Sequence, residues 1–288
     1  MSGASDTGRI GLIAGNGSLP LMVAQTLKMD GANPFVVGIE GEANAQLEEF
    51  DFISAYTGHP GKIVSALKRA KVTDVVMVGG VRGRPQLSRV RPDWTTLKIA
   101  GKMLSTLGRG DDALLRSVIG IIEDAGIRVR GVHELVPSLL APHGVLAGPK
   151  PDRDTRKSIF TAIRGATALG SLDAGQGVIA LGRRVVALEG AEGTDLMINR
   201  IAELRKVARL PDKPGGALVK LAKPGQELRA DLPTIGPETI ENAARAQLKA
   251  VAVHAGRSLV VELERVQAVA DDAGISLLGI EPDEYSIG

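Results

Sequence analysis

Residues 9–29 read RIGLIAGNGSLPLMVAQTLKM. The apolar run Arg9–Ala14 has the length of a strand, and Leu19–Met29 is predicted to be a helix with proline in its first turn, where proline is tolerated. A strand, a glycine turn and a helix in this order open nucleotide-binding α/β folds, because the turn and the helix N-terminus can present backbone N–H groups to a phosphate. The residues that we expect to contact substrate here are Gly15, Asn16, Gly17 and Ser18.

Two other interpretations of this stretch stay open. The dinucleotide fingerprint calls for a third glycine at position 20, where this chain has Pro20, although Glu40 could still hold a ribose hydroxyl as in nicotinamide-binding folds. A purely structural turn is the other alternative.

The alternation of strands and helices continues through the first half of the chain and predicts a parallel, doubly wound sheet. The predicted strands are Phe35–Ile39, Asp74–Val78 and Arg128–Val132, and the predicted helices are Gly61–Ala70, Trp94–Leu107 and Asp111–Ala125. Gly79 and Gly80 follow a strand, at the edge where open α/β sheets bind ligands, so we expect them to contact substrate too. A structural glycine turn explains this pair equally well.

Pro137–Pro151 holds four prolines and two glycines with little periodicity, which places a domain boundary there. We therefore predict an α/β protein with two domains. Residues 1–140 form a Rossmann-like nucleotide- or substrate-binding domain with a doubly wound parallel sheet, and residues 141–288 form an α/β catalytic domain with a mixed sheet. The elements expected in the second domain are helices Thr155–Leu169, Asp195–Ala208 and Glu238–Ala250, paired strands Gly177–Leu181 and Arg184–Leu188, a strand at Lys220, a strand pair bracketed by Ala252 and Leu259–Val261, and a closing helix and strand.

Composition excludes several classes of function. The chain has no cysteine among its 288 residues, so disulfides, thiolate metal sites and cysteine nucleophiles are absent. A net charge of +2 and an aromatic content of 2% argue against nucleic-acid binding, which needs basic surfaces and stacking rings. Neither a signal peptide nor an apolar run of membrane-spanning length is present, so we expect a cytoplasmic protein. Peripheral contact with the inner membrane and homo-oligomerisation stay open.

Chemistry is expected in KLAKPGQELRADLPTIG, residues 220–236. If this segment is extended, Glu227, Arg229 and Asp231 share one face, because side chains alternate along a strand. Two carboxylates and a guanidinium in one row suit a site that holds a divalent cation and a phosphate together. A solvated strand face with a local ion pair is the plain alternative.

A second acidic cluster is Glu189–Asp195, EGAEGTD, which follows a predicted strand. Its acids could form one edge of a metal site, with Thr194 placed to cap the next helix. The helix dipole alone would also explain an acid at Asp195.

Five strings of this chain, in order, resemble a known family: GLIAGNGSLP (Gly11–Pro20), GDDALLR (Gly110–Arg116), DAGQGV (Asp173–Val178), EGAEGTD (Glu189–Asp195) and KPGQELRADLPTIG (Lys223–Gly236). The family is the LpxI-type UDP-2,3-diacylglucosamine pyrophosphatases of lipid A biosynthesis. Its members are two-domain, magnesium-dependent, cytoplasmic enzymes that split this glycolipid nucleotide into UMP and 2,3-diacylglucosamine 1-phosphate. One departure is Glu227, where the family pattern leads us to expect aspartate.

The resemblance implies a hydrolase with Mg²⁺ as cofactor and a small-molecule glycolipid nucleotide as substrate. Asp231 is the expected catalytic acid, as metal ligand or as base on the attacking water, with Glu227 as its neighbour. The expected metal ligands are Asp231, Glu192 and Asp195. The expected substrate contacts, besides the glycine turns, are Lys220, Lys223, Gln226, Arg229 and Thr194. A nicotinamide-dependent oxidoreductase and a non-catalytic nucleotide-binding protein are the alternatives.

Overall fold

A computed structural model of the chain describes residues 8–81, 111–283 and 285, so the predicted helix Trp94–Leu107 lies outside the described residues. The described chain divides into two compact units. Unit 1 contains the residues up to Pro137 together with Glu227–Asp231, and unit 2 contains Ser138–Gln226 and the residues from Leu232 onward. The second half of the chain therefore contributes a short segment to the first unit, whereas the sequence prediction assigned all of residues 141–288 to the second domain.

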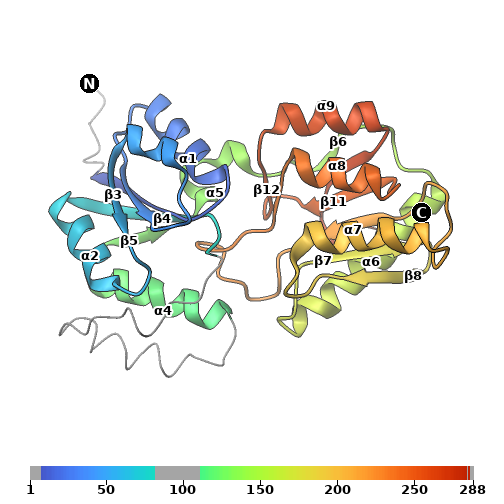
Figure 1. The fold of residues 1–288 in the computed structure, drawn as a ribbon, viewed down its shortest axis with the longest axis horizontal. Helices are drawn as coiled ribbons and strands as arrows, with labels where there is room; N and C mark the ends of the chain where they lie inside the picture. Colours follow the sequence, from blue (N-terminus) through green and yellow to red (C-terminus); the bar gives the residue numbers. More distant parts are fainter. Residues whose placement is uncertain (1–7, 82–110, 284, 286–288) are drawn as a thin grey trace. The chain divides into compact units, whose positions relative to one another are not determined.

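The sheet of unit 1 has five strands, all parallel, in the order β3-β2-β1-β4-β5 (Figure 1). The strands are β1 Arg9–Ala14, β2 Phe35–Ile39, β3 Asp51–Ala55, β4 Val72–Val78 and β5 Arg128–Arg130. The order reverses direction at β1, whose neighbours are β2 and β4, and such a switch point is where open α/β sheets bind ligands. The predicted parallel sheet is confirmed. The edge strand β3 was missed, because all its residues but Ala55 are exposed or half-buried and they carry no apolar alternation.

Helices cover both faces of this sheet. They are α1 Leu19–Met29, α2 Pro60–Arg69, α4 Asp111–Asp124 and the short α5 Val132–Leu135, with a 3₁₀ turn, η1, at Ala45–Glu49. Leu67 of α2 and Ile122 of α4 pack with Val37 and Val75 in one apolar cluster, so these two helices share a face. Figure 1 shows α1 on the other face. Burial on both faces explains why β2 is apolar throughout.

The main sheet of unit 2 has six strands in the order β6-β13-β11-β9-β7-β8. The strands are β6 Gly144–Ala147, β7 Gly177–Leu181, β8 Arg184–Leu188, β9 Ala217–Lys220, β11 Ala250–His254 and β13 Ser276–Ile280. The central strands β9, β11 and β13 are parallel, and β6, β7 and β8 pair antiparallel, so the predicted mixed sheet is confirmed. The predicted strand pair was wrong. β11 is a central strand, and β12 (Leu259–Val260) pairs with β10 (Thr234–Ile235) in a separate small sheet.

The helices of unit 2 also form two layers. They are α6 Arg153–Ser171, α7 Gly193–Lys206, α8 Pro237–Arg245 and α9 Leu263–Ala273, and a 3₁₀ turn, η3, lies at Pro137–Leu139. One core cluster packs α7, α8 and α9 on one face of the sheet, and a second packs α6 on the other. α8 ends before the predicted Ala250. Gln247 adopts a left-handed φ of 54°, and the N–H of Leu248 donates to the carbonyl of Ala243, which is a Schellman-type ending.

Glu227–Asp231, which unit 2 contributes to unit 1, is a turn and not an extended strand. The carbonyl of Glu227 accepts hydrogen bonds from the N–H groups of Ala230 and Asp231, both at 3.1 Å. The expected alternation therefore fails: Glu227 is buried, whereas Leu228 and Leu232 are only half-buried. Ala230 packs against the apolar cluster of α2 and α4.

Within the part of the chain that the structure describes, no helix is long and apolar enough to span a membrane.

Candidate functional site

The two glycine turns of unit 1 lie against each other at the switch point. The N–H of Gly15 donates to the carbonyl of Val78, and the N–H of Asn16 donates to the carbonyl of Gly80, both at 2.8 Å. A Cβ on Gly15 would lie 2.3 Å from the Gly80 carbonyl oxygen, so no larger residue fits there. β1 and β4 are neighbouring strands, so the turns that follow them, which are far apart in the sequence, lie together in the fold. Close backbone packing explains Gly15 and Gly79 structurally.

Gly17 and Ser18 face outward from this turn. Both are exposed, and a Cβ on Gly17 would meet nothing within 4 Å, although its φ of +91° still favours glycine. Ser18 occupies the N-cap of α1 but makes no side-chain cap. Asn16 donates from Nδ2 to Glu42 at 3.0 Å, which fixes the side chain of the turn. The exposed N-terminus of α1 can therefore receive an anion.

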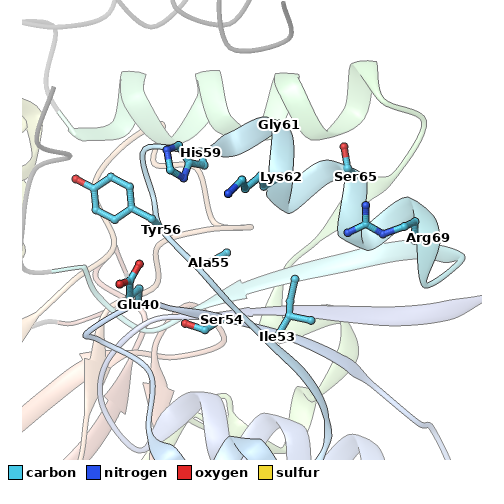
Figure 2. Close-up of a pocket in the computed structure, with 10 residues that line it drawn as sticks. All are labelled: Glu40, Ile53, Ser54, Ala55, Tyr56, His59, Gly61, Lys62, Ser65 and Arg69. Atoms are coloured by element: carbon cyan, nitrogen blue, oxygen red, sulfur yellow. The ribbon is translucent and has the colours of Figure 1, made fainter. Parts of the chain in front are cut away.

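Beside these turns, unit 1 contains a cavity of about 710 Å³ between β3 and α2 (Figure 2). It is lined by Glu40, which follows β2, by Ile53 to Tyr56 from β3 and its end, and by one side of α2. Figure 2 shows Tyr56, His59 and Lys62 around one end of the cavity and Arg69 at the other. Of these residues, only Glu40 was singled out in the sequence. A cavity needs side chains from separate segments, and no local pattern reveals it.

Ion pairs fix the turn Glu227–Asp231 on α4. Arg229 donates from Nε and Nη2 to the two carboxylate oxygens of Glu227, at 2.8 and 3.0 Å, and from Nη1 to Glu123 at 2.7 Å. Arg116 of α4 lies 3.6 Å from the same Glu227 carboxylate. Sequence analysis predicted that Arg229 binds phosphate and that Glu227 assists catalysis. In this structure the guanidinium of Arg229 faces carboxylates, which favours a role in holding the turn.

The charges in this network stabilise one another. The hydrogen bond from Arg229 is the main cause that lowers the pKa of Glu227, against the opposing effect of burial. The same hydrogen bond raises the pKa of Arg229. The ordinary pKa of a glutamate carboxyl is 4.5, and in the folded protein that of Glu227 is lower. The ion pair therefore stabilises the fold fully at pH values above 4.5, and this stabilisation is lost as the pH falls through the lowered pKa.

We expect Glu227→Gln to melt below the wild type near neutral pH, with the difference shrinking as the pH falls below about 4. Thermal melts of both proteins across the acid range measure this. The matched control is Asp154→Asn, because the Asp154 side chain is 87% exposed and its ion pair with Lys157 should contribute little at any pH. A Glu227→Gln difference that is constant down to pH ~3 would contradict the ion-pair account.

Asp231, the expected catalytic acid, ends this turn and is half-buried. Its backbone N–H is held by the Glu227 carbonyl, so the position of its side chain depends on the same ion pairs. Asp231 therefore belongs to unit 1, whereas Lys220 and the acids Glu192 and Asp195 belong to unit 2.

Unit 2 carries a buried polar network at the end of β9. The ammonium of Lys220 donates to the Thr194 hydroxyl at 2.8 Å and to the Thr234 carbonyl at 3.3 Å, and it lies 3.9 Å from Glu189. Thr194 in turn donates its hydroxyl proton to Glu189. The side chains of Lys220 and Glu189 are only 13% and 11% exposed. Thr194 does not cap α7 as predicted. Glu192 holds the N-cap position, and the Thr194 hydroxyl serves this network instead.

Glu189 is the residue of this network that sequence analysis did not select. Its string was noted as acidic, but Glu192 and Asp195 were preferred as metal ligands. The structure gives those two acids other partners: Glu192 lies 3.3 Å from Arg200, and Asp195 accepts from Asn242 at 3.0 Å. The signal that could have favoured Glu189 is its place directly after β8.

Lys223 and Gln226, both predicted substrate contacts, lie on the loop between Lys220 and the turn. Lys223 forms an ion pair with Asp173 at 2.7 Å, and its backbone N–H donates to the Gln226 side chain at 2.8 Å. The Lys223 side chain is 16% exposed. These contacts order the loop. Substrate binding by Lys223 and Gln226 stays a prediction.

The residues that the structure describes contain no group of three or more His, Asp or Glu that could hold a metal ion. Mg²⁺ does not need such a cage, because it is commonly bound by one or two carboxylates together with waters and substrate phosphates. The half-buried Asp231 meets that smaller requirement.

Comparisons with known proteins match nearly the whole length of the chain. The LpxI N-terminal domain model matches residues 9–139, and the LpxI C-terminal domain model matches residues 142–278. The UDP-2,3-diacylglucosamine pyrophosphatase LpxI of Caulobacter vibrioides is 39% identical over 277 residues, which cover 96% of this chain and 99% of that protein.

Two solved structures show only a weak likeness. The crystal structure of gox2253 has a TM-score of 0.35 at 15% identity and covers 95% of this chain and 70% of its own. The GalE-like L-threonine dehydrogenase from Cupriavidus necator has a TM-score of 0.28 at 11% identity and covers 93% of this chain and 95% of its own. TM-scores this low carry no argument about fold or function.

Proposed function

This chain belongs to the LpxI family, and we propose that it hydrolyses the pyrophosphate bond of UDP-2,3-diacylglucosamine to UMP and 2,3-diacylglucosamine 1-phosphate. The observation that carries the proposal is the 39% identity to the Caulobacter vibrioides enzyme across nearly the full length of both chains. The substrate carries two acyl chains, so we place the reaction in the cytoplasm with peripheral contact at the inner membrane, as a step of lipid A biosynthesis.

The reaction adds water to one phosphorus and breaks its bond to the bridging oxygen. We assign Asp231 to the attacking water, from which it removes a proton or which it orients through a bound cation. The fixed turn supports this role, because a backbone held by Arg229 and Glu227 gives the carboxylate a defined position. The buried ammonium of Lys220 adds positive charge that can stabilise phosphate oxygens.

Mg²⁺ is the proposed cofactor. When bound, it would neutralise pyrophosphate charge and lower the pKa of a bound water. Asp231 is the candidate protein ligand in unit 1, and Glu192 and Asp195 are the candidates in unit 2. These two acids would have to leave their present partners Arg200 and Asn242.

We expect UMP release from UDP-2,3-diacylglucosamine to require a divalent cation and to return when Mg²⁺ is added back after chelation. The physical reason is that a carboxylate cannot approach an anionic pyrophosphate without compensating charge. Release of UMP is followed with the purified chain before chelation, after exhaustive chelation and after add-back. Undiminished activity in the chelated enzyme would remove the metal from the proposal, and no UMP release under any condition would remove the function itself.

A further inference from the structure

The cavity between β3 and α2 lies wholly inside unit 1, and its lining includes none of the residues assigned above to catalysis or metal binding. We propose that it binds the nucleotide half of the substrate, with the ribose at Glu40, the base against Tyr56 and the phosphate at Lys62. This inference rests on the proposed function for the identity of the nucleotide. The site itself is argued from the residues that line it.

Its place in the sheet is the first reason. Glu40 directly follows β2, and Tyr56 directly follows β3, so both lie at the carboxyl ends of neighbouring parallel strands. The glycine turns after β1 and β4 lie along the same edge. Open α/β sheets bind nucleotides at this edge, and an acid after the second strand commonly holds ribose hydroxyls.

The charges of the cavity are the second reason. Among the residues that the structure describes, Glu40, Lys62 and Arg69 take part in no ion pair, although all three line one cavity. Arg229 of the turn Glu227–Asp231 shows the opposite behaviour, since it is paired with both Glu227 and Glu123. Exposed charges without partners are ordinary on a flat surface. Around a single cavity they form a set of hydrogen-bonding groups that is available to a polar ligand.

The start of α2 is the third reason. α2 begins at Pro60, and His59 at its N-cap makes no side-chain cap. Pro60 has no N–H, and the N–H groups of Lys62 and Ile63 donate to the His59 carbonyl, so the N–H of Gly61, which lines the cavity, is the one left in this turn for a ligand. Lys62 stands one residue further and lines the same wall. A helix N-terminus with a lysine in its first turn suits a phosphate, because the peptide dipoles and the ammonium attract the same anion.

An aromatic ring completes the set. Tyr56 meets the imidazole of His59 edge to face, with ring centroids 5.5 Å apart, which fixes the orientation of the tyrosine ring. An aromatic ring that lines a cavity can stack on a pyrimidine base. The volume of about 710 Å³ is within the range of small-molecule sites, and it exceeds what a lone phosphate would need.

The test is UMP binding to the full-length chain by calorimetry, with Lys62→Ala and Glu40→Gln as the variants. Both side chains are exposed, so neither change should impair folding, which thermal melts will verify. The matched control is Lys68→Ala, which removes an exposed lysine from the same helix outside the cavity. We expect Lys62→Ala to weaken UMP binding about tenfold and to leave uridine binding unchanged. We expect Glu40→Gln to weaken both ligands and Lys68→Ala to weaken neither.

Substrate hydrolysis gives a second measurement, in which Lys62→Ala should raise KM with kcat nearly unchanged, because the lost contact does not involve the reacting atoms. Equal KM and UMP affinity in wild type and both variants would overturn the inference. Lys62-dependent binding of inorganic phosphate without any binding of uridine would reduce the cavity to an anion site and also overturn it. If UMP binds in a Lys62-dependent way but no hydrolysis occurs, the nucleotide site stands and the proposed function falls.

Discussion

Asp231→Ala is expected to lower turnover by about a hundredfold or more while substrate affinity and folding are retained. The carboxylate is assigned to the attacking water, so its loss affects the transition state and not the bound substrate. The turn itself should persist, because the hydrogen bonds of the Asp231 backbone N–H and of the Glu227 and Arg229 side chains are retained in the variant. Steady-state kinetics, substrate affinity and melting temperature on the same preparation measure the three properties.

Asp195→Ala is the comparison variant. Asp195 lies in the first turn of α7 and accepts a hydrogen bond from Asn242, so a structural role predicts a modest loss of stability with turnover nearly intact. A loss of turnover similar to that of Asp231→Ala would instead make Asp195 a functional acid. An Asp231→Ala enzyme that keeps more than about a tenth of wild-type turnover, a change below about 1.4 kcal/mol in the barrier, would refute the assignment.

The sheet of unit 1 was largely predictable, because parallel strands covered on both faces leave continuous apolar runs such as FVVGI in β2. The paired strands β7 and β8 were predicted with the bounds that the structure shows. β3 was not predictable in this way. It lies at the edge of the sheet and pairs with one strand, β2, so fewer contacts restrict its sequence. Most of its side chains remain in contact with solvent.

The candidate site shows a different limit. The alternation of Glu227, Arg229 and Asp231 fits a strand, but the same spacing also lets Arg229 bind Glu227 within a turn. The turn is favoured by Glu123 of α4, far away in the sequence, whose carboxylate accepts a hydrogen bond from the remaining Nη1 of the guanidinium. Residue types therefore indicated a charged cluster, and its role in catalysis stays a prediction, whereas the backbone conformation depended on a distant partner that no local pattern contains.

The burial of Glu189 was equally invisible in the sequence. An acid after a strand is usually solvated, and it is the approach of Lys220 from another strand, together with the nearby Thr194 hydroxyl, that makes this one a member of a buried network. Glycine turns gave a partial success, because their positions followed from the sequence but the contact between Gly15 and Gly80 required the strand order.

Lys220→Met is expected to cost about 3 kcal/mol of folding stability in unit 2 and to lower turnover as well. Methionine fills a similar volume but leaves the Glu189 carboxylate, 11% exposed, without its cation, and removing one partner of a buried pair is more damaging than removing both. The Thr194 hydroxyl oxygen would also lose the hydrogen bond that it accepts from the Lys220 ammonium. Denaturant unfolding measures the stability, and UMP release measures the turnover.

The double variant Lys220→Met with Glu189→Gln separates the pair from the rest of the site. If the two side chains interact through the buried network, the double variant should be more stable than the sum of the single losses predicts, by about 1 kcal/mol or more. Turnover should stay low in the double variant, because neutralising Glu189 restores the balance of charge but not the cation that faces phosphate. Strictly additive stability losses would show that Lys220 and Glu189 act independently, and recovery of turnover in the double variant would exclude Lys220 from phosphate binding.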